Sequence, residues 1–339
     1  MVKKIIWTVI ALFVLALLFN WDILSYGIRQ AQGQLRITFN TLPVETILND
    51  TLFPDSLKQK IKIVQQARVF AFQELGLTPS ENYTTFYDQK GEVALWNLSA
   101  SKAYMLEPKL WSFPILGSFP YKGFFDLERA KQERDELIDQ GYDARIRPVG
   151  GWSTLGWTTD PILSNMLERE EGSLAELIIH ELTHSTLFVK DNIEFNENLA
   201  SFIGEQGAIQ FLDEKYGKNS HAYFDYVLAE EDSKTFRNQM LLATSKLDSL
   251  YRSISNLSDS SKNRRKQLMI DNIINSIDSL HFHNSRYYEI FETSRPNNAY
   301  FMSFLRYYSA KDSLQSMLTQ EYEGNLKNFI AEMKKYHEQ

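Results

Sequence analysis

Gly172-Ser-Leu-Ala-Glu-Leu-Ile-Ile-His180-Glu181-Leu-Thr-His184 is the stretch of sequence that decides the fold. The residues before His180 have the composition of a starting helix, and their apolar side chains recur almost all round it, which predicts burial. On a helix, positions i and i+4 share one face, so the imidazoles of His180 and His184 point the same way, about one turn apart.

Two neutral imidazoles at this spacing can hold one Zn²⁺ at roughly 2.0–2.1 Å each. Glu181 follows the first ligand, rotated by about 100° around the axis, where it can accept a proton from water that the metal polarises. The alternative is a solvated helix face with two unrelated histidines. The apolar flanks argue against it, because buried charged groups are rare unless they are paired or bind a metal.

A catalytic zinc site has three protein ligands and keeps one position open. The third ligand is predicted in Asn196-Glu197-Asn198-Leu-Ala-Ser-Phe202, which looks like the Asn-Glu-x-x-Ala-Ser-Phe helix of zinc peptidases with two histidines and one glutamate. Asn196 is the expected N-cap of this second helix. Twelve residues separate His184 from Glu197, enough for the first helix to end near Lys190, turn at Asp191-Asn192 and return antiparallel.

Two other acids, Glu194 and Glu205, compete with Glu197 for the role of third ligand. Glu197 also has a simpler interpretation, as an acidic residue in the first turn of a helix, where the helix dipole favours negative charge. We prefer Glu197 as the ligand and keep the two rivals open.

Several segments together resemble a known family. They are residues 26–35, 119–126, 152–157 with Asp160-Pro161, the His180–His184 motif and 195–197, with a weaker match at 296–300. The chain resembles the bacterial family of predicted zinc aminopeptidases, membrane- or lipid-anchored envelope proteins with an HExxH motif. The resemblance implies one Zn²⁺ per chain, held by His180, His184 and Glu197, with Glu181 as general base. Residues 213–294 do not share the resemblance.

Composition is that of an ordinary globular protein, with 43% hydrophobic and 23% charged residues in a chain of 339. The formal net charge of −7 argues against a nucleic-acid partner, which usually needs a basic face. The chain has no cysteine, which excludes disulfides, a cysteine nucleophile and thiolate metal ligands.

The N-terminus predicts a membrane segment. Lys3-Lys4 precedes fifteen residues, 5–19, that carry no charge or strongly polar group. Fifteen is short for a spanning helix and suits a signal peptide, but no small-residue cleavage site follows. We therefore expect an uncleaved signal anchor over residues 1–25, with the two lysines inside by the positive-inside rule. The prediction is a single-pass protein of the cytoplasmic membrane whose catalytic domain is periplasmic.

The remaining patterns predict a mainly helical α+β protein with a zincin-like metallopeptidase core. Residues 57–75 and 126–140 read as helices, 144–149 as a strand, and residues 84–87 and 93–98 as a β-hairpin. We expect the peptidase core to span 26–212, a helical insertion or hairpin 213–294 interrupted near 253–265, and a C-terminal helical segment 295–339 packed on the core. The loop 152–161 is either a structural turn or a lip of the active site.

The function predicted from these observations is hydrolysis of peptides by a membrane-anchored zinc peptidase, and the resemblance implies the removal of N-terminal residues. Tyr121 or Tyr300 is a candidate oxyanion donor, and Asn297 and Asn298 are candidates for contacts with the substrate. Two alternatives remain open: an endopeptidase of the same class, or a non-catalytic envelope protein with a structural zinc site. An intact Glu181 speaks against the latter, because a structural site does not need it.

Overall fold

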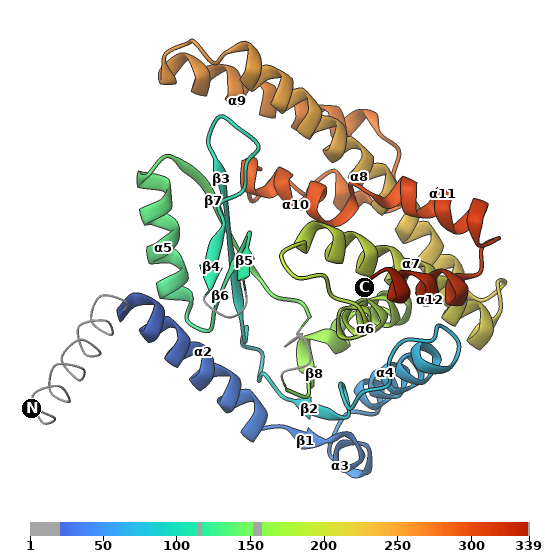
Figure 1. The fold of residues 1–339 in the computed structure, drawn as a ribbon. Coiled ribbons are helices and arrows are strands. Elements are labelled where there is room, and N and C mark those ends of the chain that lie inside the picture. The colour runs from blue at the N-terminus through green and yellow to red at the C-terminus, as the bar shows by residue number, and fades with distance from the viewer. Residues whose placement is uncertain (1–20, 114–116, 152–157, 338–339) are drawn as a thin grey trace, which may run out of the picture.

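The fold is described from a computed structural model, which covers residues 21–113, 117–151 and 158–337. The protein is mainly helical, with small β-sheets set among the helices (Figure 1). Its centre is a pair of helices, α6 (Glu171–Thr186) and α7 (Ile193–Tyr216). Both are long apolar helices with buried positions around most of their circumference, which explains why they form the middle of the core.

The strands form three small sheets. One has the order β1-β2-β8, one has the order β6-β3-β7, and β4 pairs with β5. All the pairs are antiparallel except β2 with β8. The strands are β1 (Leu42–Pro43), β2 (Thr85–Tyr87), β3 (Trp96–Lys102), β4 (Trp111–Phe113), β5 (Gly117–Phe119), β6 (Lys122–Phe124), β7 (Tyr142–Pro148) and β8 (Ile162–Leu163).

Helices cover the β6-β3-β7 sheet on both faces. α5 (Leu127–Asp139) packs on one face and α10 (Asn298–Tyr308) on the other (Figure 1). Near the N-terminal end of the described chain, α2 (Trp21–Phe39) is tied to the same sheet, since Tyr26 and Gln30 donate hydrogen bonds to the carbonyl of Gly123. This arrangement brings α10 between the sheet and α7, so that α10 contacts both β7 and α7.

The core around α6 and α7 also contains helices from both ends of the described chain. They are α3 (Val44–Asn49), α4 (Asp55–Gln73), α11 (Lys311–Glu321) and α12 (Leu326–His337). Phe202 of α7, for example, stacks edge-on against Phe329 of α12 at 5.7 Å between ring centroids. The C-terminal helices therefore share one apolar cluster with the HExxH helix.

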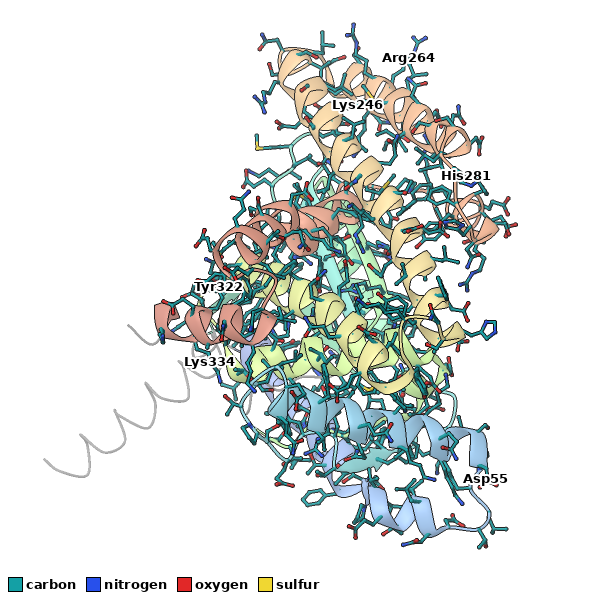
Figure 2. The ribbon with its side chains drawn as sticks, turned by 90° about the vertical axis from the view of Figure 1, so that its right-hand side faces the viewer. Asp55, Lys246, Arg264, His281, Tyr322 and Lys334 are labelled. Carbon is teal, nitrogen blue, oxygen red and sulfur yellow. The ribbon has the colours of Figure 1, made fainter. Side chains whose placement is uncertain are left out.

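A second apolar cluster joins α8 (His221–Ser253), α9 (Asp259–Ser276) and α10. α8 and α9 form the helical pair that the sequence predicts, and the turn between them is only residues 254–258, shorter than expected. Figure 2 shows Lys246 and Arg264 towards the end of the pair at which this turn lies. The predicted interruption at 253–265 is wrong in extent, because polar Ser and Asp residues begin α9 as an N-terminal turn instead of forming a loop.

The predicted β-hairpin is wrong. Residues 85–87 and 96–102 are strands, but they belong to different sheets: β2 pairs with β1 and β8, and β3 with β6 and β7. The alternation of side chains identifies strands correctly and says nothing about their partners. By contrast, α4, α5 and β7 confirm the predicted helices at 57–75 and 126–140 and the strand at 144–149 to within a few residues at each end.

The predicted location, a single-pass protein of the cytoplasmic membrane, is contradicted. Within residues 21–113, 117–151 and 158–337, no helix combines the length and the apolar character that crossing a membrane requires. Residues 5–19, on which the prediction rested, lie outside the described residues, as do residues 152–157 of the predicted active-site loop.

Candidate metal centre

Three predicted ligands converge between α6 and α7. His180, His184 and Glu197 each offer one donor atom, and these atoms lie within 4.8 Å of one another. The two Nε2 atoms are 3.1 Å apart, and Glu197 Oε2 is 3.5 Å from that of His180 and 3.4 Å from that of His184. Ligand atoms of a tetrahedral zinc site lie about 3.3–3.5 Å apart, given bonds of about 2.0–2.2 Å. The triangle therefore has the size that such a site requires.

The donor set itself needs a cation. A carboxylate accepts hydrogen bonds only, and a neutral imidazole presents a lone pair at one of its nitrogens. Three such groups facing one another at 3.1–3.5 Å repel unless a proton or a metal ion lies among them. His184 and Glu197 are only 8% and 7% exposed, so water contributes little screening. The residues present thus fit a metal ion.

Without a metal ion, protons take its place. Burial alone lowers the pKa of His180, but the hydrogen bond to Glu197 and the charge of Glu181 outweigh it, so the pKa is raised. For Glu197, burial alone would raise the pKa. The charge of His184 and the hydrogen bonds from both imidazoles outweigh burial and bring the pKa well below its usual range. Both shifts favour a charged imidazole against a charged carboxylate.

The segment between α6 and α7 places Glu197. α6 ends at Thr186, earlier than predicted, and Asp191 turns the chain with a φ of 60°. Asn192 caps α7 by accepting a hydrogen bond from the Phe195 amide. Asn196, the predicted N-cap, lies inside α7, and its side chain instead donates to the Val189 carbonyl and accepts from the Val189 amide. The two helices run antiparallel as expected: Glu197 lies beside His184, and further along α7 Gly204 lies beside the earlier residues Glu176 and His180 of α6.

The two rival ligands lie elsewhere. Glu194 accepts a hydrogen bond from the Ser309 hydroxyl at 2.8 Å. Glu205 pairs with Arg237, at 3.4 Å, and with Lys311. Among the described residues, the only group of three or more His, Cys, Asp or Glu side chains placed to hold a metal ion is the one that includes Glu197.

Glu181 lies beside the triangle and outside it. It is partly exposed, and burial raises the pKa of its carboxyl although both histidines act in the opposite direction. Its Oε1 lies against the backbone of Gly151, shortly after the end of β7. A cavity of about 780 Å³ occurs between α2 and α5, and its lining does not include His180, Glu181, His184 or Glu197.

The other predicted site residues divide into two sets. Burial, and then the charge of Glu197, raise the pKa of Tyr121 well above its ordinary value, which indicates that Tyr121 lies near Glu197. Tyr300 instead packs against the Arg145 guanidinium at 4.6 Å and against Phe304. Asn297 caps α10, and Asn298 is fully buried.

Sequence reasoning missed three residues near Glu197. Arg147 on β7 donates a hydrogen bond to the Tyr307 hydroxyl on α10. The charge of Glu197 reaches both residues: it adds to the effect of Tyr307 in raising the pKa of Arg147 and to that of burial in raising the pKa of Tyr307. Arg306 lies over the Tyr121 ring at 5.4 Å. They come from segments more than a hundred residues apart, and no local spacing marks them.

Comparison with known proteins then supplies the family. The model of the family described as "Putative aminopeptidase" matches residues 25–339. The chain belongs to this family. The match includes residues 213–294, so the expectation that this stretch falls outside the resemblance is wrong. No curated protein and no solved structure matches the chain significantly. Membership of this family supports peptidase activity in general and implies a peptide substrate.

Proposed function

We propose that the protein is a zinc-dependent peptidase in which His180, His184 and Glu197 hold the metal ion and Glu181 is the general base. The observation that carries this proposal is the convergence of the three donor atoms within 4.8 Å, with the acidic side chain of Glu181 beside them. Two histidines with one carboxylate are a ligand set of catalytic zinc sites. Zn²⁺ bound there would supply Lewis acidity for the polarisation of water and of the scissile carbonyl.

Glu181 carries the proton in this mechanism. Its carboxylate accepts a proton from the attacking water and then donates it to the nitrogen of the departing amine as the C–N bond breaks. A pKa raised by burial favours the first step, because it makes the carboxylate a stronger acceptor of the proton from water. The backbone of Gly151 restricts where the carboxylate can lie, which orients it for both steps.

Tyr121 is the proposed donor to the oxyanion. Burial and the charge of Glu197 keep its phenol protonated, so the hydroxyl can donate a hydrogen bond where negative charge develops. Tyr300 is less suited, because its ring is packed among Phe291, Phe304 and the Arg145 guanidinium.

Aminopeptidase action is the finer proposal, and the family description supports it. It is tested by comparing a peptide that has a free N-terminal amine with the same peptide acetylated at that amine. An aminopeptidase cleaves only the free form, and the endopeptidase alternative requires cleavage of both.

The experiment for the mechanism is Glu181→Gln, with zinc content and peptide hydrolysis measured on the same preparation. The change keeps the size of the side chain and removes the proton acceptor. We expect zinc to remain at about one per chain and hydrolysis to fall at least about 100-fold, within the range that general-base catalysis contributes. Loss of zinc in this variant would make Glu181 a ligand and overturn the assignment.

A further inference from the structure

We propose that the substrate carries a carboxylate that binds to Arg147 and Arg306 beside the Glu197 side of the metal centre. The inference deepens the proposed peptidase function and rests on it. It concerns which peptides the site accepts, and it starts from two guanidinium groups that neither metal binding nor the proton transfers use.

The first step is the position of the two arginines. Arg147 is the penultimate residue of β7, an edge strand, and its Nη2 donates to the Tyr307 hydroxyl at 3.1 Å. Arg306 precedes Tyr307 on α10 and covers the Tyr121 ring at 5.4 Å.

Hydrogen bonds of Asn198 hold α10, which carries Arg306 and Tyr307, next to the proposed ligand Glu197. Asn198, which directly follows Glu197, donates a hydrogen bond to the backbone carbonyl of Arg306 at 2.7 Å. Its side-chain oxygen also accepts from the Ala310 amide at 2.7 Å. α10 is therefore docked on α7 directly beside the ligand, and Arg306 and Tyr307 have fixed positions relative to it.

Within the described part of the chain, no carboxylate pairs with either arginine. Among the residues that the structure describes, neither guanidinium forms an ion pair within 4.0 Å, although Arg306 is only 7% exposed. The hydrogen bond that the Arg306 guanidinium donates from Nη2 to the Pro120 carbonyl is long, at 3.5 Å. Buried charges are usually paired, and a planar guanidinium is suited to a carboxylate.

Charge balance leads to the same ligand class. A divalent ion would be balanced by the carboxylates of Glu181 and Glu197. Arg147 and Arg306, which have no described carboxylate within 4.0 Å, then form a local excess of positive charge. The phenols of Tyr121 and Tyr307 lie with them and add hydrogen-bond donors, since burial raises the pKa of both. An anionic group of the substrate would neutralise this excess and accept these hydrogen bonds.

Two sources can supply the carboxylate: the C-terminus of a short peptide, or an acidic side chain. Four peptides distinguish them, namely Ala-Ala-Phe, Ala-Ala-Phe-amide, Ala-Ala-Glu-amide and Ala-Ala-Gln-amide. Binding of each is measured by calorimetry to the full-length, zinc-loaded chain carrying Glu181→Gln, so the result does not depend on turnover. Hydrolysis by the wild-type chain is measured in parallel.

We expect Ala-Ala-Phe to bind at least 10-fold more tightly than its amide if the C-terminus is the source. If an acidic side chain is the source, Ala-Ala-Glu-amide should bind more tightly than Ala-Ala-Gln-amide by a similar factor. Arg147→Gln should reduce the preference towards parity, and Arg147→Lys should retain part of it. Arg145→Gln is the matched control, because Arg145 lies two residues away on β7 but covers the Tyr300 ring, and it should keep the full preference.

Equal binding of all four peptides, or a preference that survives Arg147→Gln unchanged, would overturn the inference. Failure of the wild-type chain to hydrolyse any peptide would instead refute the proposed function. A carboxylate preference in binding without hydrolysis would leave Arg147 and Arg306 as an anion site on a protein that is not a peptidase.

Discussion

Gly151 lies so close to Glu181 that a Cβ at residue 151 would be 2.3 Å from Oε1 of the carboxylate. The same Cβ would be 2.9 Å from Cδ1 of Leu177, one turn earlier on α6. Both distances are shorter than carbon contacts allow, so any side chain at residue 151 must move Glu181. The backbone after β7 and the proposed general base therefore constrain each other.

Gly151→Ala should consequently lower kcat/KM for peptide hydrolysis by about 10–100-fold, because a displacement of about 1 Å at a catalytic group can cost that much. Zinc content should stay at about one per chain, since the atoms nearest to that Cβ belong to Glu181 and Leu177 and not to a proposed ligand. Gly27→Ala on α2 is the control, because a Cβ there meets no atom within 4 Å. Equal kinetics of the two variants would show that Gly151 does not position Glu181.

A second prediction separates the third ligand from its rivals. Glu197→Ala should weaken zinc affinity by more than about 100-fold, since even changes to residues behind the ligands cost 10–100-fold. Glu194→Ala should bind zinc normally, because Glu194 is one turn earlier on the same helix and contacts Ser309 instead. Competition with a zinc-binding dye gives both affinities. Normal affinity in the Glu197 variant would remove it from the ligand set.

The part of the site that the sequence predicts is the part that lies in short segments. The spacing of His180 and His184 predicts a shared helix face, and the structure brings both to Glu197. The cap was misassigned because Asn192 and Asn196 are both acceptable N-caps by residue type. Only the position of Val189 shows that the Asn196 side chain is used for the turn.

Long-range partners could not be predicted. Arg147 and Tyr307 are 160 residues apart and meet because β7 is an edge strand that α10 covers. The same limit explains the wrong β-hairpin. The prediction paired β2 with β3 because they are close in sequence, whereas β2 pairs with β1 and β8, and β3 with β6 and β7. Alternating side chains specify that a segment is a strand, and packing decides which strand it pairs with.

A third prediction concerns pH. Glu176, one turn before His180, has its pKa raised from 4.5 to about 7 by burial and by the charge of Glu230. A raised pKa means that the folded state holds the proton more tightly than the unfolded state. The stability that this supplies is complete below about pH 4.5 and is lost as pH rises to about 7.

Glu176→Gln should remove this dependence, because the amide can still accept the hydrogen bond from Tyr226 and carries no charge. Unfolding by urea at pH 5 and pH 8 measures the effect. We expect the variant to gain stability over the wild type at the higher pH, by at most roughly 3 kcal/mol for a shift from 4.5 to about 7. A constant difference between the two proteins across this range would contradict the shift.

The last prediction concerns Asn298, which the sequence marked as a candidate substrate contact. Its side chain is fully buried: its amide donates to the carbonyls of Lys102 and Ala103, and its oxygen accepts from the Tyr251 hydroxyl at 2.7 Å. Its backbone amide donates to Asp143, which also pairs with buried Lys266. These contacts join β3, β7, α8, α9 and α10, so we interpret Asn298 as a residue of the fold.

Asn298→Ala should therefore lower the free energy of unfolding by about 3 kcal/mol, because it leaves several buried polar groups without partners. Tyr251→Phe removes one donor from the same network and should cost less, about 1 kcal/mol. Chemical denaturation measures both, and KM for peptide hydrolysis by the folded variants should match that of the wild type. An Asn298→Ala protein with unchanged stability and a raised KM would restore the substrate contact and refute the structural role.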